Sequence, residues 1–165
     1  MKILVLSDSH AGISFMRRAI QATKPDAVIH LGDYYDDAVA LAEENPQLRF
    51  HMVPGNCDLN RMICREPEIL CYDVCGVRLY MTHGHKHNVK RTMLPLLADA
   101  RAAGAAAVLY GHTHVACCNR EDDGLWVLNP GAGGSFGGSV GLIETDGKTI
   151  KACRLLWQAD LEALL

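Results

Sequence analysis

Short apolar segments that stop abruptly at Asp, Asn or His recur through this chain of 165 residues. The segments Ile3–Leu6, Ala27–Leu31 and Ala106–Tyr110 are almost continuously apolar. This pattern is typical of strands in a parallel sheet, which are buried on both faces. The segment Leu48–Val53 is also short and runs directly into Pro54-Gly55-Asn56, so we expect a further strand there. These segments constrain the fold most, because each needs other elements to cover both of its faces.

Helical patterns alternate with these strands in the first half of the chain. Apolar residues recur at helical spacing within 13–24 and 38–44, and a further helix is expected within 88–103. Pro95 must stand near the start of that last helix or kink it, because proline cannot donate the internal hydrogen bond. The first half therefore indicates an α/β fold.

The second half of the chain is mostly strand. The segments 69–73 and 77–82 flank a Cys75-Gly76 turn and predict a β-hairpin. Further strands are expected at 115–119, 125–128, 141–144 and 149–155. Together the two halves favour two packed sheets with helices outside them, and the length favours a single domain over residues 1–165.

Charge and composition exclude several classes of function. The net charge of −3 gives no broad cationic surface, so a nucleic-acid polymer is not expected as a partner. The N-terminal apolar run is too short for a signal peptide and no run could span a bilayer, so we expect a cytoplasmic protein without a membrane partner. A homo-oligomer stays open.

The seven cysteines fit a reducing compartment, since their number is odd and no Cys-x-x-Cys pair occurs. A structural zinc site could be imagined from Cys64, Cys71 and Cys75, but their spacing matches no standard motif. We therefore expect most of the thiols to be free and partly buried.

Side chains able to bind a metal follow five of the expected strands, and ligand sites in such sheets gather at the carboxyl ends of strands. The set is Asp8, His10, Asp33, Asn56, His83, His112 and His114. Each alone has an ordinary explanation, such as a helix cap for Asp8 or a turn for Asn56. Five coincidences at strand ends are not expected, so the set predicts a metal site.

The chemistry of this set indicates which ions it would bind. Mixed carboxylate, amide and imidazole ligands suit borderline divalent ions such as Mn²⁺, Fe²⁺, Zn²⁺ or Ni²⁺. The ligands are too many for one ion, and they divide between two ions if one carboxylate bridges. His112 and His114 would then serve different ions of one pair.

Five sequence blocks carry a resemblance to a known family. They are DSH (8–10), GD (32–33), GNCD (55–58), HGH (83–85) and GHTH (111–114). In this order they resemble the calcineurin-like metallophosphoesterase superfamily, and within it the small YfcE-type phosphodiesterases of bacteria and archaea. NPG (129–131) resembles a further block of these small members. The resemblance implies a four-layer α/β/β/α sandwich, in which two mixed β-sheets are flanked by helices.

The resemblance also implies a dinuclear site for two divalent ions, with Mn²⁺ expected first. One ion would be held by Asp8, His10, Asp33 and His114. Asp33 would bridge, and the second ion would be completed by Asn56, His83 and His112. His85 matches no obligatory ligand but lies close enough in sequence to line the site.

The expected activity is hydrolysis of a small or nucleotide-like phosphodiester. A water that bridges two metal ions becomes hydroxide near neutral pH, and we expect it to attack phosphorus without a covalent enzyme intermediate. Asp33 and His85 are the expected catalytic residues beside the metals. Asp58 is a candidate acceptor for a ligand histidine.

Cys57 departs from the superfamily pattern. Many members have His at this position, in GNH, where it can stabilise the transition state or protonate the leaving group. A thiol is a poorer charged donor, so leaving groups that need protonation should react slowly unless His85 or a metal-bound water substitutes. The simpler explanation is that Cys57 is a small residue that fills space beside the site.

A second departure follows NPG, where the subfamily often continues toward Ser and Arg but this chain reads AGGSFGG (132–138). These glycines form either a loop over the site or a flexible connection. Phosphate binding would then rest on Lys86, Lys90 and Arg91, although such a cluster more often forms a solvated loop.

Two alternatives to a phosphodiesterase stay open. A phosphomonoesterase or nucleotidase would use the same metals and differ only in its substrate pocket. A non-catalytic protein-binding scaffold is the other, because the small retromer subunit of eukaryotes is similar to this family in fold. The full ligand set in this chain favours the enzyme.

Overall fold

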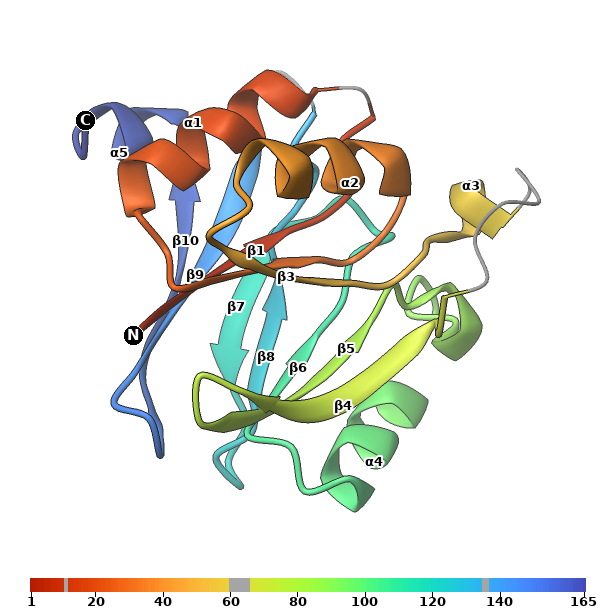
Figure 1. The fold of residues 1–165 in the computed structure, drawn as a ribbon. Helices are drawn as coiled ribbons and strands as arrows, with labels where there is room; N and C mark the ends of the chain where they lie inside the picture. Colours follow the sequence, from red (N-terminus) through yellow and green to blue (C-terminus); the bar gives the residue numbers. More distant parts are fainter. Residues whose placement is uncertain (11, 60–65, 135–136) are drawn as a thin grey trace.

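The computed structural model describes residues 1–10, 12–59, 66–134 and 137–165, and its centre is a pair of sheets (Figure 1). In these ranges each sheet has five strands. The first sheet has the order β10-β9-β1-β2-β3, with β1 (Lys2–Leu6), β2 (Ala27–His30), β3 (Arg49–Met52), β9 (Ser139–Thr145) and β10 (Ile150–Trp157). The second has the order β4-β5-β6-β8-β7, with β4 (Ile69–Val74), β5 (Val77–Thr82), β6 (Ala107–Leu109), β7 (Cys117–Arg120) and β8 (Trp126–Asn129).

Helices cover the outer faces of both sheets (Figure 1). The first sheet is covered by α1 (Ile13–Thr23), α2 (Tyr35–Glu44) and α5 (Gln158–Glu162), and the second by α4 (Leu94–Ala102). The expected four-layer α/β/β/α sandwich of two mixed sheets is therefore confirmed. In the described ranges, no helix combines the length and hydrophobicity needed to cross a membrane.

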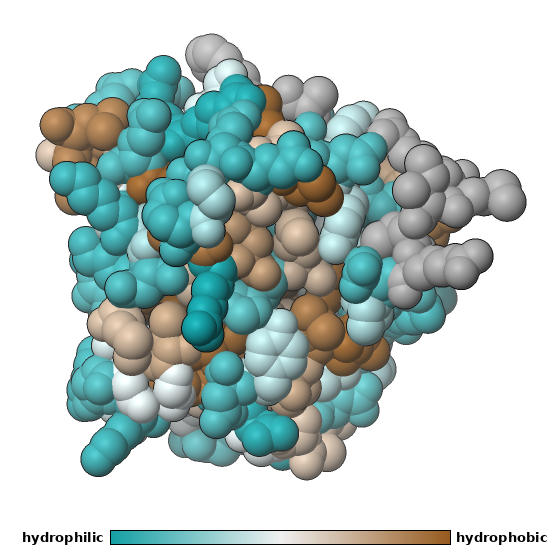
Figure 2. Space-filling view, in the orientation of Figure 1, coloured by the Kyte–Doolittle hydropathy of each residue, from teal (hydrophilic) through white to brown (hydrophobic). Residues whose placement is uncertain are grey.

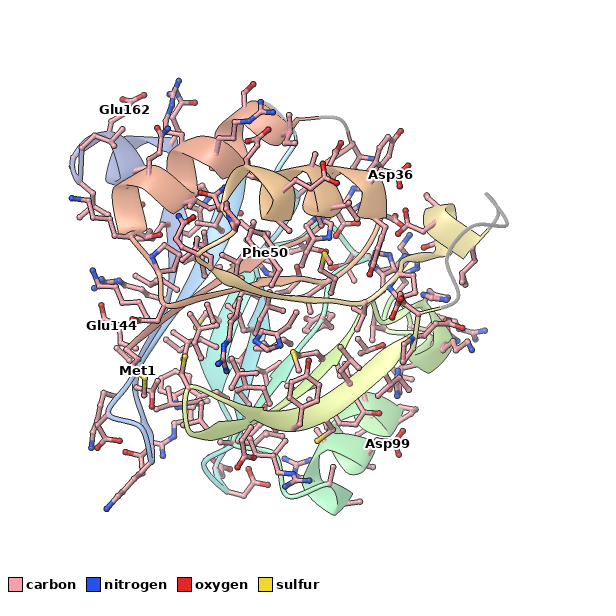
Figure 3. The ribbon with its side chains drawn as sticks, viewed as in Figure 1. Met1, Asp36, Phe50, Asp99, Glu144 and Glu162 are labelled. Atoms are coloured by element: carbon pink, nitrogen blue, oxygen red, sulfur yellow. The ribbon has the colours of Figure 1, made fainter. Side chains whose placement is uncertain are left out.

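Strand β1 shows why the apolar runs are continuous. Leu4 and Leu6 pack toward the helices, whereas Ile3 and Val5 pack between the two sheets, and all four are fully buried. Both alternating faces of the strand must therefore be apolar. Phe50 on β3 lies beneath the helix layer in the same way (Figure 3).

The core between the sheets reaches the surface at the front of the molecule. Figure 2 shows hydrophobic residues in the band that separates the upper helices from the lower sheet, under a largely hydrophilic helix layer. A cavity of about 260 Å³ lies at this side, lined by Arg49 and His51 from β3 and by Asp73 and Val74 from β4. The His51 ring bonds the Tyr72 hydroxyl at 2.9 Å and so links the two sheet edges.

Parallel pairing determines where the strand ends lie. β1 pairs with β2 and β2 with β3, while β5 pairs with β6 and β6 with β8, all in parallel. Their carboxyl ends therefore gather at one edge of each sheet. The segments that follow them include α3 (Asn56–Leu59) and a short 3₁₀ helix at His85–His87.

The expected elements were found with small shifts of their ends, and three short helices were not predicted. Pro95 stands at the start of α4, so that helix begins there instead of kinking. The short helices are α3, the 3₁₀ turn at His85–His87 and α5. A helix of three to five residues is too short to show a hydrophobic period, which explains why the sequence pattern missed them.

His30 ends β2 and is fully buried. The Gly32 amide donates to its Nδ1 at 3.3 Å, so the ring is neutral with its proton on Nε2, and that nitrogen has no hydrogen-bond partner. Burial lowers the pKa of His30 to about 4, against the weaker opposing effect of nearby carboxylates.

Acid is predicted to destabilise the metal-free protein through His30. The unfolded state takes up the proton near pH 6.5 and the folded state only near 4, so stability is complete above 6.5 and falls toward 4. The 2.5-unit difference amounts to about 3 kcal/mol. Denaturant unfolding from pH 7 to 4 should show a shallower loss for His30→Asn, which keeps an acceptor for Gly32.

His51→Asn is the matched control for this measurement. The pKa of His51 is also lowered by burial, but the side chain is only half-buried, so its removal should flatten the pH dependence less. Equal pH dependence in wild type and His30→Asn would contradict the prediction.

Candidate metal centre

The carboxyl ends of strands from both sheets meet at one edge and are joined by hydrogen bonds. The Asp8 amide donates to the Gly32 carbonyl at 3.0 Å within the first sheet, and the Gly111 amide to the His83 carbonyl at 3.1 Å within the second. Across the sheets, the His112 amide donates to Asp8 Oδ2 at 3.1 Å. This edge therefore collects the side chains that follow β1, β2, β3, β5 and β6.

A first cluster contains Asp8, His10, Asp33 and His114. Each offers one ligand atom, and these atoms all lie within 4.8 Å of one another. His114 Nε2 is 3.1 Å from Asp8 Oδ1 and 3.2 Å from His10 Nε2. Two imidazole nitrogens and carboxylate oxygens that converge in this way form a set of donors for a cation.

A second group of metal-binding side chains also contacts Asp33. Its Oδ2 is 3.5 Å from His83 Nε2, and the His83 and His112 rings have centroids 5.1 Å apart. Asp33 Oδ1 accepts the Cys57 amide at 3.0 Å, which places the Asn56–Cys57 turn beside it. Asp33 therefore contacts both groups and can bind a cation with either.

Unpartnered buried atoms test whether a metal fits this site. Asp8 Oδ1, Asn56 Oδ1 and His83 Nε2 are all buried and make no hydrogen bond. Leaving a buried polar atom unsatisfied costs about 1–3 kcal/mol, so such atoms are rare without a reason. Each of the three is a carboxylate, amide or imidazole donor of the kind that divalent ions bind. The residues present therefore fit divalent cations.

The backbone at the site is strained. Asp8, His10, Asp33, His112 and His114 all have left-handed φ values, between 41° and 66°. A residue other than glycine in this region costs on the order of 1–3 kcal/mol and persists only when its surroundings hold it there. This left-handed conformation turns the chain sharply and directs the side chain into the site.

Two glycines of the motifs are required by close approach. A Cβ at Gly55 would overlap Asp33 Oδ1, and a Cβ at Gly111 would overlap Ser7 Oγ. Any larger residue would displace the carboxylates of the site or their neighbours. This explains why Gly precedes Asn56 and His112.

In the metal-free site, burial and neighbouring charges shift the pKa values of the candidate ligands in different directions. Burial opposes charge on both Asp33 and His83, but their mutual contact outweighs it, lowering the pKa of Asp33 and raising that of His83. Burial and the nearby positive charges of His83 and Lys90 lower the pKa of His112 to about 4. His112 is thus neutral near pH 7 and has a nitrogen lone pair available for a cation.

Cys57 and His85 border the two donor groups. Cys57 is exposed as a residue, but partial desolvation of its thiol, together with Asp33, raises the pKa of that thiol to about 11, so it stays protonated. The His85 ring centroid is 5.5 Å from that of His83 and 6.1 Å from that of His112. Its Nε2 lies 3.1 Å from Glu68, and burial lowers its pKa.

Asp58 differs from its predicted role. Its carboxylate accepts the Gly55 amide at 2.7 Å and the Tyr35 amide at 2.8 Å, so it holds backbone and not a ligand histidine. The acceptor for His83 Nδ1 is the Leu31 carbonyl, at 2.7 Å. A carbonyl carries no sequence signal, so the pattern could not identify it.

Two supporting side chains were missed as well. The Ser7 hydroxyl donates to Asp8 Oδ2 at 2.6 Å, in the buried interior of the site. Asn129 donates to the Gly111 carbonyl and to Thr113 Oγ1, both at 3.0 Å, and so holds the GHTH turn. The NPG block had signalled Asn129, but not what it contacts.

The glycine-rich segment is packed where the structure describes it. The Gly133 amide donates to the Ser7 carbonyl at 3.0 Å, and a Cβ on Gly134 would overlap the Ser9 carbonyl. These glycines lie against the turn after β1. Residues 135–136 of this segment, and Cys64 of the imagined zinc site, lie outside the described residues.

The basic cluster divides into different environments. Lys86 pairs with Glu68 at 2.6 Å, whereas Lys90 is exposed and its charge acts on His112. Arg91 is exposed too. Lys90 is thus the cation of this cluster whose charge reaches a candidate ligand.

Known proteins resemble this chain over most of its length. The model of the calcineurin-like phosphoesterase superfamily domain matches residues 1–148. The "Probable metallophosphoesterase YsnB" of Bacillus subtilis is 31% identical over 136 residues, which cover 80% of this chain and 75% of that protein.

Solved structures share the fold. An archaeal phosphodiesterase superposes with a TM-score of 0.67 at 23% identity, covering 95% of this chain and 99% of that one. A single mutant of Vps29 from Entamoeba histolytica gives 0.70 at 21% identity, again covering 95% and 99%.

Ser7 is predicted to support metal binding through Asp8. Ser7→Ala removes the hydroxyl that orients the carboxylate, and loss of such a supporting contact typically lowers metal affinity by about 10- to 100-fold. Titration calorimetry with Mn²⁺ measures the change. The control is Ser139→Ala, because that hydroxyl makes an equally short buried bond, 2.6 Å to the Pro130 carbonyl. Equal affinities for the two variants would contradict the prediction.

Proposed function

Since the chain belongs to the calcineurin-like phosphoesterase superfamily and is a metal-dependent phosphoesterase, we propose that it hydrolyses a small or nucleotide-like phosphodiester at a two-metal site. The observation that carries this proposal is the position of Asp33. Its carboxylate contacts Cys57 and His83 and also belongs to the cluster of Asp8, His10 and His114. A carboxylate in that position suits two ions better than one.

The proposed ligands follow from this arrangement. Asp8, His10, Asp33 and His114 would hold one ion, and Asp33, Asn56, His83 and His112 the other. Mn²⁺ is the proposed metal, with Fe²⁺, Zn²⁺ and Ni²⁺ as alternatives of the same ligand preference. When bound, such ions polarise phosphoryl oxygens, stabilise the charge that builds on them and activate water.

The protein's own residues prepare the site for an anion. Ser7 and the His112 amide both donate to Asp8 Oδ2, which leaves Oδ1 facing the cluster. His83 is fixed by the Leu31 carbonyl, so its Nε2 faces Asp33. His85 borders the second group, with its Nε2 beside Glu68 and its Nδ1 without a hydrogen-bond partner, and we assign it the positioning or protonation of the leaving oxygen.

Charge favours a diester over a monoester. A phosphate monoester carries about −1.5 to −2 charges at neutral pH, whereas a diester carries one. Of the described lysines beside the site, Lys86 is neutralised by Glu68, so few side-chain cations are available for the extra charge of a monoester. The similarity in fold to an archaeal phosphodiesterase is consistent with this preference.

A protein-binding scaffold is compatible with the fold, because Vps29 shares it. No observation on this chain favours that alternative, and a buried set of unpartnered ligand atoms would be costly in a protein that never binds metal. The proposed location is the cytoplasm, which the six free cysteines of the described residues support.

Metal-dependent turnover is the first prediction of this proposal. Chelator-stripped protein should hydrolyse bis-p-nitrophenyl phosphate only after Mn²⁺ is added, and mono-p-nitrophenyl phosphate much more slowly. Asp33→Asn should reduce the diester rate by about 100-fold or more, because both groups of donors lose the shared charge. Release of p-nitrophenol, followed by absorbance, gives both rates.

Asp122→Asn is the control, since that carboxylate is exposed in the turn before β8, at the end of the strand opposite to the site edge. Faster hydrolysis of the monoester would replace the diesterase proposal with a monoesterase. Absence of turnover with metal shown to be bound would leave the scaffold.

Cys57 is predicted to limit the hydrolysis of diesters with poor leaving groups. A thiol whose pKa is raised to about 11 transfers its proton reluctantly, whereas an imidazole can act as a general acid near neutral pH. Cys57→His should therefore raise the rate on a dinucleotide relative to bis-p-nitrophenyl phosphate by about tenfold or more. Cys57→Ser, the control, should leave that ratio unchanged. An unchanged ratio in Cys57→His would show that the leaving group does not depend on this side chain.

A further inference from the structure

Cys118 and Cys153 bring two thiols together from different sheets. Their Sγ atoms are 3.1 Å apart, although the residues are separated by 35 positions in the chain. Cys118 lies on β7 and Cys153 on β10, the last strand at one end of each sheet. These two strands lie side by side (Figure 1). Both cysteines are free thiols.

Backbone register directs both side chains into the space between the sheets. Cys118 stands opposite Leu128 on β8, and Cys153 stands opposite Ile143 on β9. Opposed residues of antiparallel strands point to the same face, and Leu128 and Ile143 are fully buried between the sheets. The thiols therefore meet at the margin of this core, because the register of the two sheets directs both side chains toward it.

We propose that Cys118 and Cys153 form a reversible disulfide that links the two sheets, at a site distinct from the metal centre. A disulfide has an S–S distance of about 2.05 Å, so the sulfur atoms need to approach by only about 1 Å. This inference rests on the position of the thiols and is independent of the proposed phosphodiesterase activity.

The oxidation balances with hydrogen peroxide as the oxidant. The thiolate of one of the two cysteines attacks one peroxide oxygen, the O–O bond breaks, and a sulfenic acid and one water result after protonation. The sulfur of the other cysteine then attacks the sulfenic acid sulfur and releases the second water. Two thiols and one peroxide thus give one disulfide and two waters, and a thiol reductant reverses the reaction.

Either thiol can react first, because the two sulfur atoms lie 3.1 Å apart and both side chains pack against the same core. Whichever sulfur is oxidised to the sulfenic acid, the other lies next to it and can resolve it.

Peptide mapping tests the proposal directly. The purified full chain is treated with peroxide, its remaining thiols are alkylated under denaturing conditions, and it is digested with trypsin. Cleavage after Arg and Lys places Cys117 and Cys118 in residues 102–120 and Cys153 in residues 152–154. We expect these two peptides to be joined, at the sum of their masses less two hydrogens, and to separate when dithiothreitol is added.

Single variants identify which neighbour is linked. Cys118→Ser and Cys153→Ser should each abolish the joined peptides. Cys117→Ser should retain them, because the Cys117 thiol contacts Asn119 Oδ1 instead, at 3.0 Å. A link between Cys117 and Cys118 within 102–120, a link that survives in Cys118→Ser, or thiols left reduced after peroxide treatment would overturn the proposal.

Thermal unfolding supplies a second readout. A cross-link over this separation restricts the unfolded chain, so the oxidised wild type should melt about 5–10 °C above the reduced form. Peroxide should not raise the melting temperature of Cys153→Ser. A melting temperature that is equal or lower after complete linkage would show that the bond strains the fold, and would overturn the disulfide as a native modification.

Discussion

The buried hydrogen bond from the His83 imidazole to the Leu31 carbonyl joins the second sheet to the first at the edge where their parallel strands end. Because Nδ1 is occupied by this bond, Nε2 turns toward Asp33, which belongs to the other sheet. The His112 amide makes a comparable link to Asp8. With these bonds the ends of the two sheets form one site, to which each sheet contributes only part of the candidate ligands.

Much of this arrangement could be predicted from the sequence, because residue type and position carry it. The apolar runs identify the buried strands, and the polar residues after them identify the edge where ligands gather. The five motif blocks identify the family, whose model covers residues 1–148. Features of the backbone could not be predicted in this way, because the type of a side chain does not determine them. The left-handed backbone at Asp8 and His114, and the carbonyl of Leu31 as an acceptor, are of this kind.

The contacts of Asp58 also depend on backbone geometry that the sequence does not show. An acid beside a histidine-rich site predicts a partner for a histidine, but two backbone amides, that of Gly55 before α3 and that of Tyr35 at the start of α2, donate to its two oxygens. Backbone amides are more numerous than any one kind of side chain, so they compete well for a carboxylate. The strained residues and the buried donors have a common effect, since both leave the ligand atoms in place before any cation arrives. Such preorganisation is what a site that stabilises charge requires.

The contact between His112 and Asp8 spans 104 positions of the chain, and it has a consequence for how the protein is made. During synthesis the strand that carries Asp8 is finished early, but the site lacks two histidines until β6 and the turn after it have left the ribosome. Strands paired over long separations also fold slowly, because the entropy of closing a large loop is lost before the stabilising contacts form. A growing chain therefore exposes its carboxylates and thiols to free metal ions well before it can bind them in the native arrangement. The last ligands to emerge decide when the protein can become a metalloprotein.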